Sequence, residues 1–199
     1  MFHRQAGTTR RPPGPGAVIL IGFMGAGKSS VGGALARQMG WTFEDLDERI
    51  ERRNGRKVQE IFRDLGEAEF RRAEHEALKE LLKGLREGAE RVIALGGGAF
   101  VQKRNARLIE AGGVPTVFLD ADVDELWRRC RSQAEQQGTE RPLLGGLEGF
   151  RELYEKRRPH YMKASWRQET GGKNIEGIAE ELVQALGLRR REGRRGEKQ

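Results

Sequence analysis

The chain has 199 residues, of which 36% are hydrophobic, which is enough for one core and excludes a second large domain. The formal charge of +7 comes from the two ends of the chain, because residues 17–187 carry equal numbers of basic and acidic side chains. This balance excludes the basic folded face that is typical of a nucleic-acid-binding domain. The only cysteine, Cys130, excludes an intramolecular disulfide, and no apolar stretch approaches the roughly 20 residues that a membrane span needs.

We therefore expect one domain at 17–187 between disordered basic tails at 1–16 and 188–199. The expected location is the cytoplasm, and neither nucleic acid nor a membrane is expected as a partner.

The first element is an apolar run at 17–22 that is typical of a buried strand. It leads into the sequence GFMGAGKS at 22–29, which fits the phosphate-binding pattern G-x-x-x-x-G-K-[ST]. Unpaired N–H groups and the helix dipole favour negative charge, so this turn and the helix expected at 28–39 are suited to nucleotide phosphates. Lys28 is expected to reach the β- and γ-phosphates, and the Ser29 hydroxyl is expected to bind Mg²⁺. The alternative is a glycine-rich turn with an incidental Lys-Ser pair.

The second strand, expected at 41–45, ends in carboxylates. Alternation along an extended chain places Asp45 and Asp47 on the same side, facing one cleft. One carboxylate of such a pair can hold Mg²⁺ through water while the other orients or deprotonates an attacking hydroxyl. For Asp47 alone, the alternative is a helix N-cap. A short, charge-rich helical insertion is expected to follow at 47–65.

A long helix expected from about 66 to 85 carries Arg71, and a helix near the C-terminus ends with Arg157. A solvated helix face is the alternative for either residue, but an anionic substrate must be held, and the planar fork of Arg suits a carboxylate. The third strand, expected at 91–95, runs into three glycines at 96–98. Such a run indicates that something approaches the backbone closely, with a plain tight turn as the alternative.

The fourth strand, expected at 115–120, ends in Asp120, for which we expect a helix cap. Residues 133–148 are typical of a mobile loop, and they include Arg141 and three glycines that can act as hinges. An arginine on a closing lid accelerates phosphoryl transfer, and closure excludes water. The alternative is a surface loop with a solvated arginine.

A weak apolar pattern at 166–170 indicates a fifth strand. Along the whole chain, apolar runs alternate with amphipathic stretches. This order predicts an α/β fold of three layers, αβα, around a five-stranded parallel sheet. The insertion and the loop both lie at the carboxyl ends of the strands, where open α/β sheets bind ligands.

Taken together, these residues resemble the shikimate kinase family of P-loop kinases, which is similar in fold to the nucleoside monophosphate kinases. The match runs from about 18 to 186 and rests on six ordered motifs: GFMGAGKS at 22–29, FEDLDERIE at 43–51, GEAEFRRAE at 66–74, GGG at 96–98, RPLL at 141–144 and RRPHY at 157–161. The resemblance implies a substrate-binding insertion at about 46–75 and a lid at about 133–148. It also implies transfer of the γ-phosphate of ATP to the 3-hydroxyl of shikimate, in the pathway to chorismate and the aromatic amino acids.

The resemblance implies a role for each matching residue. Asp47 would contact the shikimate hydroxyls and act as the base, with Lys28 and Arg141 as the other catalytic residues. Ser29 would ligate Mg²⁺, and Asp45 would support the metal through water. The expected contacts to ATP are Gly25, Ala26, Gly27, Lys28, Ser29, Ser30, Arg141 and Lys173, and the expected contacts to shikimate are Asp47, Arg71, Gly97 and Arg157.

Two positions depart from the family pattern. Ser29 stands where threonine is more frequent, which keeps the hydroxyl, and Lys173 beside Asn174 stands where arginine is often found near the adenine. We expect a monomer whose partners are the small molecules shikimate and ATP. The rival readings are another small-molecule P-loop kinase, acting on gluconate or a nucleotide, and a regulatory or nucleic-acid-binding ATPase that uses its basic tails.

Overall fold

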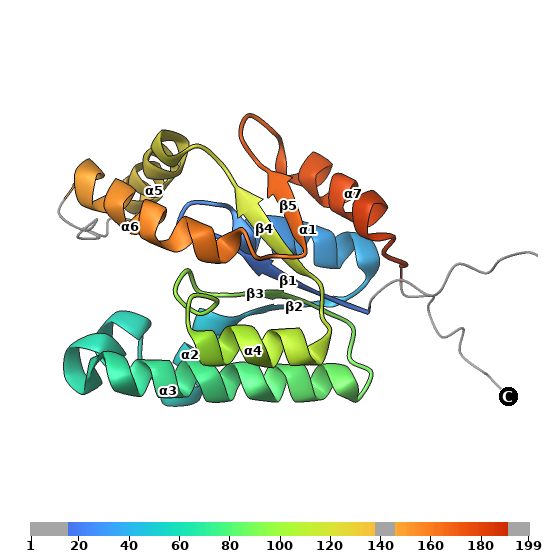
Figure 1. Cartoon of the computed structure of the whole chain (residues 1–199), viewed down its shortest axis with the longest axis horizontal. Helices are drawn as coiled ribbons and strands as arrows, with labels where there is room; N and C mark the ends of the chain where they lie inside the picture. The colour runs from blue at the N-terminus through green and yellow to red at the C-terminus, as the bar shows by residue number, and fades with distance from the viewer. Residues whose placement is uncertain (1–15, 138–145, 191–199) are drawn as a thin grey trace, which may run out of the picture.

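The computed structural model describes residues 16–137 and 146–190 (Figure 1). Within these residues, five parallel strands form one sheet in the order β2-β3-β1-β4-β5. The predicted α/β class and five-stranded parallel sheet are confirmed. The strands are β1 (Ala17–Ile21), β2 (Thr42–Asp45), β3 (Arg91–Ala94), β4 (Thr116–Asp120) and β5 (Trp166–Glu169).

The helices of the described residues cover both faces of this sheet. Figure 1 shows α1 packed beside α7 on one side and α3 beside α4 on the other, while α5 and α6 lie next to each other. Their bounds are α1 (Lys28–Met39), α2 (Leu46–Asn54), α3 (Val58–Arg86), α4 (Lys103–Gly112), α5 (Val123–Gln137), α6 (Leu147–Tyr161) and α7 (Ile175–Leu186). The predicted three-layer αβα arrangement is therefore confirmed.

Strands β1 and β4 form the centre of the core. Every residue of both strands is buried, as expected for parallel strands covered on two faces. In the register of the sheet, Leu20 of β1 lies beside Ala94 of β3 and Val117 of β4. Phe23, which directly follows β1 and Gly22, is also fully buried and belongs to the same hydrophobic cluster.

Helix α3 bends at a single residue. Gly66 has φ 81° and ψ 171°, values outside the helical region that a glycine adopts at little cost. The bend separates a first segment, which follows α2, from the long second segment that carries Arg71. The predicted helical insertion and the predicted long helix starting at 66 are thus both present, joined through one glycine.

Two expected boundaries differ from those observed. Helix α5 continues to Gln137 and α6 begins at Leu147, so both ends of the range expected for a loop, 133–148, are helical. Leu188 is buried in the hydrophobic core, and its N–H donates to the Val183 carbonyl, so the expected C-terminal tail cannot begin before residue 189.

The strand order places a crevice at the carboxyl end of β1. The chain passes from β1 to β2 and β3 on one side and then to β4 on the other, so the connections leave β1 in opposite directions. Ligands of open α/β sheets bind at such a reversal. Within the described ranges, no helix is both long enough and apolar enough to cross a lipid bilayer.

Candidate active site

The turn between β1 and α1 has the backbone of a phosphate-binding loop. Gly22, Gly25 and Gly27 all have positive φ, and a β-carbon on Gly25 would stand 2.6 Å from the Leu126 carbonyl oxygen. Gly27 precedes α1 and contributes no side-chain cap, so the first N–H groups of this helix face outward unpaired by a side chain. The predicted anion site is therefore built from glycine geometry and a helix N-terminus.

Lys28 lies half-buried within this loop. Its ammonium group donates to the carbonyl oxygens of Gly22 and Phe23, at 3.0 and 2.9 Å. Burial lowers the pKa of Lys28, and the carboxylates of Asp47 and Asp45 oppose that effect. The cation is thus held at the loop, between the backbone that binds anions and the two carboxylates.

Asp45 connects the phosphate loop to α2. One carboxylate oxygen, Oδ1, accepts from the N–H groups of Asp47 and Glu48, which makes Asp45 the N-cap of α2. The other, Oδ2, accepts from the Ser29 hydroxyl at 2.8 Å. The alternative that Asp47 is the cap is therefore wrong. The two carboxylates interact, although Asp47 lies in the first turn of α2 and not on an extended strand.

Asp47 is half-buried, and one of its carboxylate oxygens is fully buried. Among the described residues, its Oδ1 has no hydrogen-bond partner. Burial, followed by repulsion from Asp45, raises the pKa of Asp47 to about 6, against the attraction of Lys28. A carboxylate with this pKa is mostly ionised at neutral pH, and it is a stronger base than the carboxylate of an exposed aspartate.

The three glycines after β3 are the point where the expected substrate residues converge. A β-carbon on Gly96 would lie 2.5 Å from Asp47 Oδ1, and one on Gly98 would lie 2.8 Å from both terminal nitrogens of Arg71. A β-carbon on Gly97 would be 3.4 Å from an Arg157 nitrogen. Glycine is required at 96 and 98, where a β-carbon would collide with Asp47 or Arg71, whereas the distance at Gly97 is an ordinary contact. The run also forms a tight turn, closed by the Ala99 N–H that donates to the Gly96 carbonyl at 3.0 Å, so both interpretations of the glycines hold.

Arg71 is held in a preset orientation. Its Nε and Nη1 donate to Glu67 and Glu74, and its guanidinium lies 5.1 Å from the centre of the Phe70 ring. Glu74 is buried, and burial raises its pKa even though Arg71 lowers it. No described residue accepts a hydrogen bond from Arg71 Nη2, so this donor is available at the glycine run.

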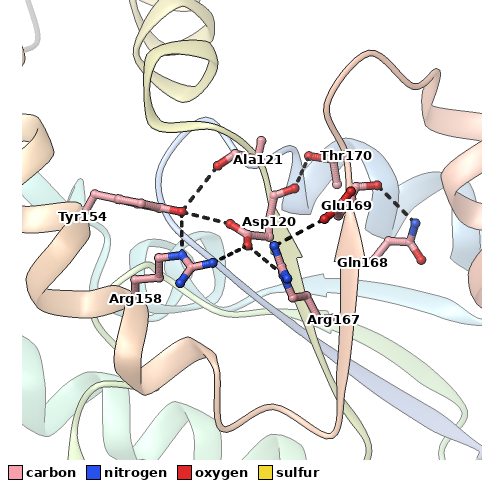
Figure 2. Close-up of polar contacts among 8 residues, drawn as sticks. All are labelled: Asp120, Ala121, Tyr154, Arg158, Arg167, Gln168, Glu169 and Thr170. Atoms are coloured by element: carbon pink, nitrogen blue, oxygen red, sulfur yellow. Dashed lines mark hydrogen bonds and ion pairs between the residues drawn. The ribbon is translucent and has the colours of Figure 1, made fainter.

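Arg157 and Arg158 are neighbours in α6 but contact different groups. Arg157 lies over the ring of Phe23 in the phosphate loop, 5.9 Å from the ring centre, and forms no ion pair within the described ranges. Arg158 instead contacts Asp120 and Tyr154 (Figure 2). Tyr161, one turn after Arg157, donates from its hydroxyl to the Gly97 carbonyl.

A cavity lies beside the phosphate loop. It has a volume of about 420 Å³ and is bounded by residues 25–31, by Arg129 of α5 and by Lys173. The residues expected to contact ATP within the described ranges all line this cavity: Gly25, Ala26, Gly27, Lys28, Ser29, Ser30 and Lys173. Asn174 accepts from the Gly177 N–H and caps α7, so Lys173, and not Asn174, faces this cavity.

Sequence reasoning missed Arg129. Its guanidinium donates to the Thr170 carbonyl at 3.0 Å and reaches the Gly25 carbonyl at 3.5 Å, which ties α5 to the phosphate loop. Nothing in the sequence separates Arg129 from Arg128 or Arg131, since all three lie in one charged helix. Only the hydrogen bonds of Arg129 to Thr170, just after β5, and to Gly25 reveal it.

Two further expectations have different outcomes. Asp120 does not cap α5, because Asp122 accepts from the Asp124 N–H there, so that prediction is wrong. Arg141 lies outside the described residues, and its expected role on a lid stays a prediction.

Comparison with known proteins identifies the relatives of this site. The family model for shikimate kinase matches residues 24–187. The chain belongs to the shikimate kinase family. A shikimate kinase of Cereibacter sphaeroides is 42% identical over 86% of this chain and 83% of its own length, and one of Thermus thermophilus is 42% identical over 85% and 89%.

Solved structures agree with this membership. A shikimate kinase from Acinetobacter baumannii in complex with shikimate is 31% identical, with a TM-score of 0.76 over 88% of this chain and 93% of its own. A gluconokinase from Sinorhizobium meliloti is 21% identical with a TM-score of 0.53, which shows a shared fold alone. As a shikimate kinase, this protein is an ATP-dependent phosphotransferase that acts on a hydroxyl group.

Proposed function

We propose that this shikimate kinase transfers the γ-phosphate of ATP to the 3-hydroxyl of shikimate, giving shikimate 3-phosphate and ADP. The observation that carries the proposal is the convergence of Asp47, Arg71 and Arg157 on the three glycines after β3, beside the phosphate loop. A half-buried carboxylate and two arginines at one glycine run suit a substrate that carries both a carboxylate and a reactive hydroxyl.

Arg71 and Arg157 hold the substrate carboxylate in this proposal. Arg71 is fixed by Glu67 and Glu74 before any substrate arrives, so little side-chain entropy is lost when it binds. Arg157 has no carboxylate partner among the described residues and contributes an uncompensated positive charge. The backbone of Gly97, which lies close to Arg157, contacts a substrate hydroxyl in this proposal.

Asp47 accepts the proton of the attacking hydroxyl. The hydroxyl oxygen forms the new bond to the γ-phosphorus while the bond from that phosphorus to the β,γ-bridging oxygen breaks, leaving ADP. Lys28 stabilises charge on the phosphate oxygens from its place in the loop, and Arg141 adds a second cation there. Asp47 Oδ1 is suited to its role because it has no hydrogen bond to give up within 16–137 and 146–190.

The oxygen donors beside the loop fit Mg²⁺. Ser29 supplies a hydroxyl, and Asp45 Oδ2 lies 2.8 Å from it, while Asp45 Oδ1 is occupied by the α2 cap. Hydroxyl and carboxylate oxygens are the donors that Mg²⁺ prefers, and it usually keeps several waters and binds substrate phosphates. Ser29 would hold the ion directly and Asp45 through water; when bound, Mg²⁺ neutralises charge on the β- and γ-phosphates.

The proposal extends to a monomer in the cytoplasm. A single buried cysteine and the use of ATP are in keeping with that compartment. Light scattering after size-exclusion chromatography measures the mass directly, and a dimer would contradict the monomer without touching the catalytic proposal.

The test of the reaction is ADP release from Mg·ATP by the purified protein, with and without shikimate. Gluconate and nucleoside monophosphates serve as controls, because they represent the rival kinases. A response to shikimate alone is expected. ADP release with gluconate or a nucleoside monophosphate at a similar rate would overturn the substrate assignment.

Two variants divide the site into its proposed parts. Arg71→Ala is expected mainly to raise KM for shikimate, because a carboxylate contact is lost. Arg141→Ala is expected to lower kcat by roughly two orders of magnitude or more, because a cation at the transferred phosphate is lost. An Arg71→Ala enzyme with unchanged KM and lowered kcat would contradict the first assignment.

A further inference from the structure

Asp120 is a buried carboxylate outside the proposed chemistry. It ends β4, is 4% exposed, and accepts hydrogen bonds from three side chains (Figure 2). Its Oδ1 accepts from the Tyr154 hydroxyl at 3.0 Å, and its Oδ2 accepts from Arg167 Nε at 2.9 Å and Arg158 Nη2 at 3.4 Å. A buried charge with this many partners anchors the segments that supply them.

Two of the three partners belong to α6. Tyr154 and Arg158 are four residues apart and so lie on one face of the helix, where Arg158 Nε also donates to the Tyr154 hydroxyl at 3.2 Å. Burial raises the pKa of Tyr154 to about 12, so its hydroxyl stays protonated and remains a donor to Asp120. The polar face of α6 is therefore fixed to the end of β4.

The same helix carries Arg157 toward the phosphate loop. The ring of Tyr154 packs edge-on against Phe23, with ring centres 5.5 Å apart, and Phe150 packs against Phe23 in the same way at 4.9 Å. Arg157 lies over that same Phe23 ring. The rotation of α6 that Asp120 fixes is thus the rotation that brings Arg157 to the glycine run.

The third partner, Arg167, comes from β5 and not from α6. It bonds the same carboxylate oxygen as Arg158, and the two side chains have similar exposure, 45% and 35%. Arg167 therefore shares the ion pair but has no direct part in orienting α6, which makes it a natural control.

We infer that Asp120 is a positioning residue for substrate binding, which acts through Tyr154 and Arg158 to hold Arg157 in place. The inference rests on the proposed role of Arg157 as a contact to the substrate carboxylate. Without the polar anchor, α6 keeps its apolar contacts to Phe23 but loses the bonds that fix its rotation. A displacement near 1 Å at a charged contact is enough to weaken substrate positioning.

Asp120 itself is a poor test position, because its loss would leave Arg158 and Arg167 beside each other without their carboxylate and would endanger folding. The experiment compares Tyr154→Phe, Arg158→Met and Arg167→Met, together with Arg157→Ala, in the full chain. The readouts are KM for shikimate, KM for ATP, kcat and the melting temperature.

Tyr154→Phe and Arg158→Met are expected to raise KM for shikimate about five- to tenfold, with kcat and KM for ATP within about twofold, because one or two hydrogen bonds are lost. Arg167→Met is expected to lower the melting temperature about as much as Arg158→Met while leaving KM for shikimate within about twofold. Equal effects of Arg158→Met and Arg167→Met on that KM would overturn the inference and leave a stabilising ion pair alone.

The Arg157→Ala variant separates this inference from the proposed function. If Arg157→Ala leaves KM for shikimate unchanged, the proposed substrate contact is wrong. If Arg157→Ala raises it strongly while Tyr154→Phe and Arg158→Met do not, the contact stands and the positioning role of Asp120 is wrong.

Discussion

A β-carbon on Gly96 would stand 2.5 Å from Oδ1 of Asp47, closer than real β-carbons approach other atoms. The backbone just after β3 and the Asp47 side chain at the start of α2 therefore fit together only because residue 96 has no side chain. In the part of the chain that the structure describes, that oxygen is buried beside Gly96 without a hydrogen bond, in the position where we propose that it accepts a proton.

Gly96→Ala is expected to lower kcat by about tenfold or more, because the methyl group displaces the Asp47 carboxylate from its place. KM for shikimate is expected to change less, since Arg71 and Arg157 are not displaced. Steady-state kinetics at saturating Mg·ATP measures both. A rise in KM with kcat preserved would show that Asp47 binds the substrate without acting on its proton.

Gly98→Ala is expected to change KM for shikimate more than kcat, the opposite of Gly96→Ala. The new β-carbon would stand 2.8 Å from both terminal nitrogens of Arg71, so the guanidinium must move and KM for shikimate is expected to rise about tenfold. Gly84→Ala is the matched control, because a β-carbon there has its nearest neighbour at 3.7 Å and the residue lies in the same helix as Arg71. An unchanged KM in Gly98→Ala would remove Arg71 from the substrate site.

The pH dependence of the reaction follows from Asp47. Because the pKa of Asp47 is raised to about 6, kcat/KM for shikimate is expected to fall tenfold per pH unit well below pH 6 and to level off above pH 7. The measurement is the rate between pH 4.5 and 8.5, in buffers of constant ionic strength. A profile that is flat down to pH 5 would contradict the raised pKa or the role as base.

Asp47→Asn is expected to lose activity and gain stability. A carboxyl group whose folded pKa lies above its unfolded value of about 3.8 binds more protons when folded, so its ionisation costs stability above pH 6, and the cost disappears below the unfolded pKa. The amide removes that cost. We expect a gain on the order of 2 kcal/mol at pH 7.5 that shrinks as the pH falls through 6 toward 4. Urea titrations at pH 7.5 and 4.5 test the sign; equal gains at both would mean that ionisation is not the cause.

Deleting residues 1–14 and 189–199 is expected to leave kcat, both KM values and the melting temperature unchanged. Leu188 stays in this shortened chain because it packs in the hydrophobic core. If the shortened protein lost ADP release that depends on shikimate, the basic ends would have a part in the reaction. The alternative of a tail-dependent ATPase would then regain support.

Features of the fold and the site could be predicted from the sequence where their chemistry requires particular residue types. The loop at 22–29, the glycines at 96–98 and the fold class were all predictable, because a phosphate-binding turn and a crowded backbone demand particular residues. Asp120 was mispredicted, since a carboxylate at a strand end has several common uses and only the packing of α6 selects one. Arg129 was missed, because its neighbours in α5 carry the same charge at similar spacing.

Phe23 occupies the first of the four positions that the phosphate-loop pattern leaves open, yet it is fully buried between Phe150 and Tyr154 and lies beneath Arg157. The motif allows any residue at position 23, but in this chain the packing around Phe23 restricts the choice. A loop grafted from a more distant P-loop protein would bring the phosphate-binding backbone but a foreign side chain at this position. Such a chimera should recover substrate binding only when the matching aromatic face of α6 is exchanged along with it.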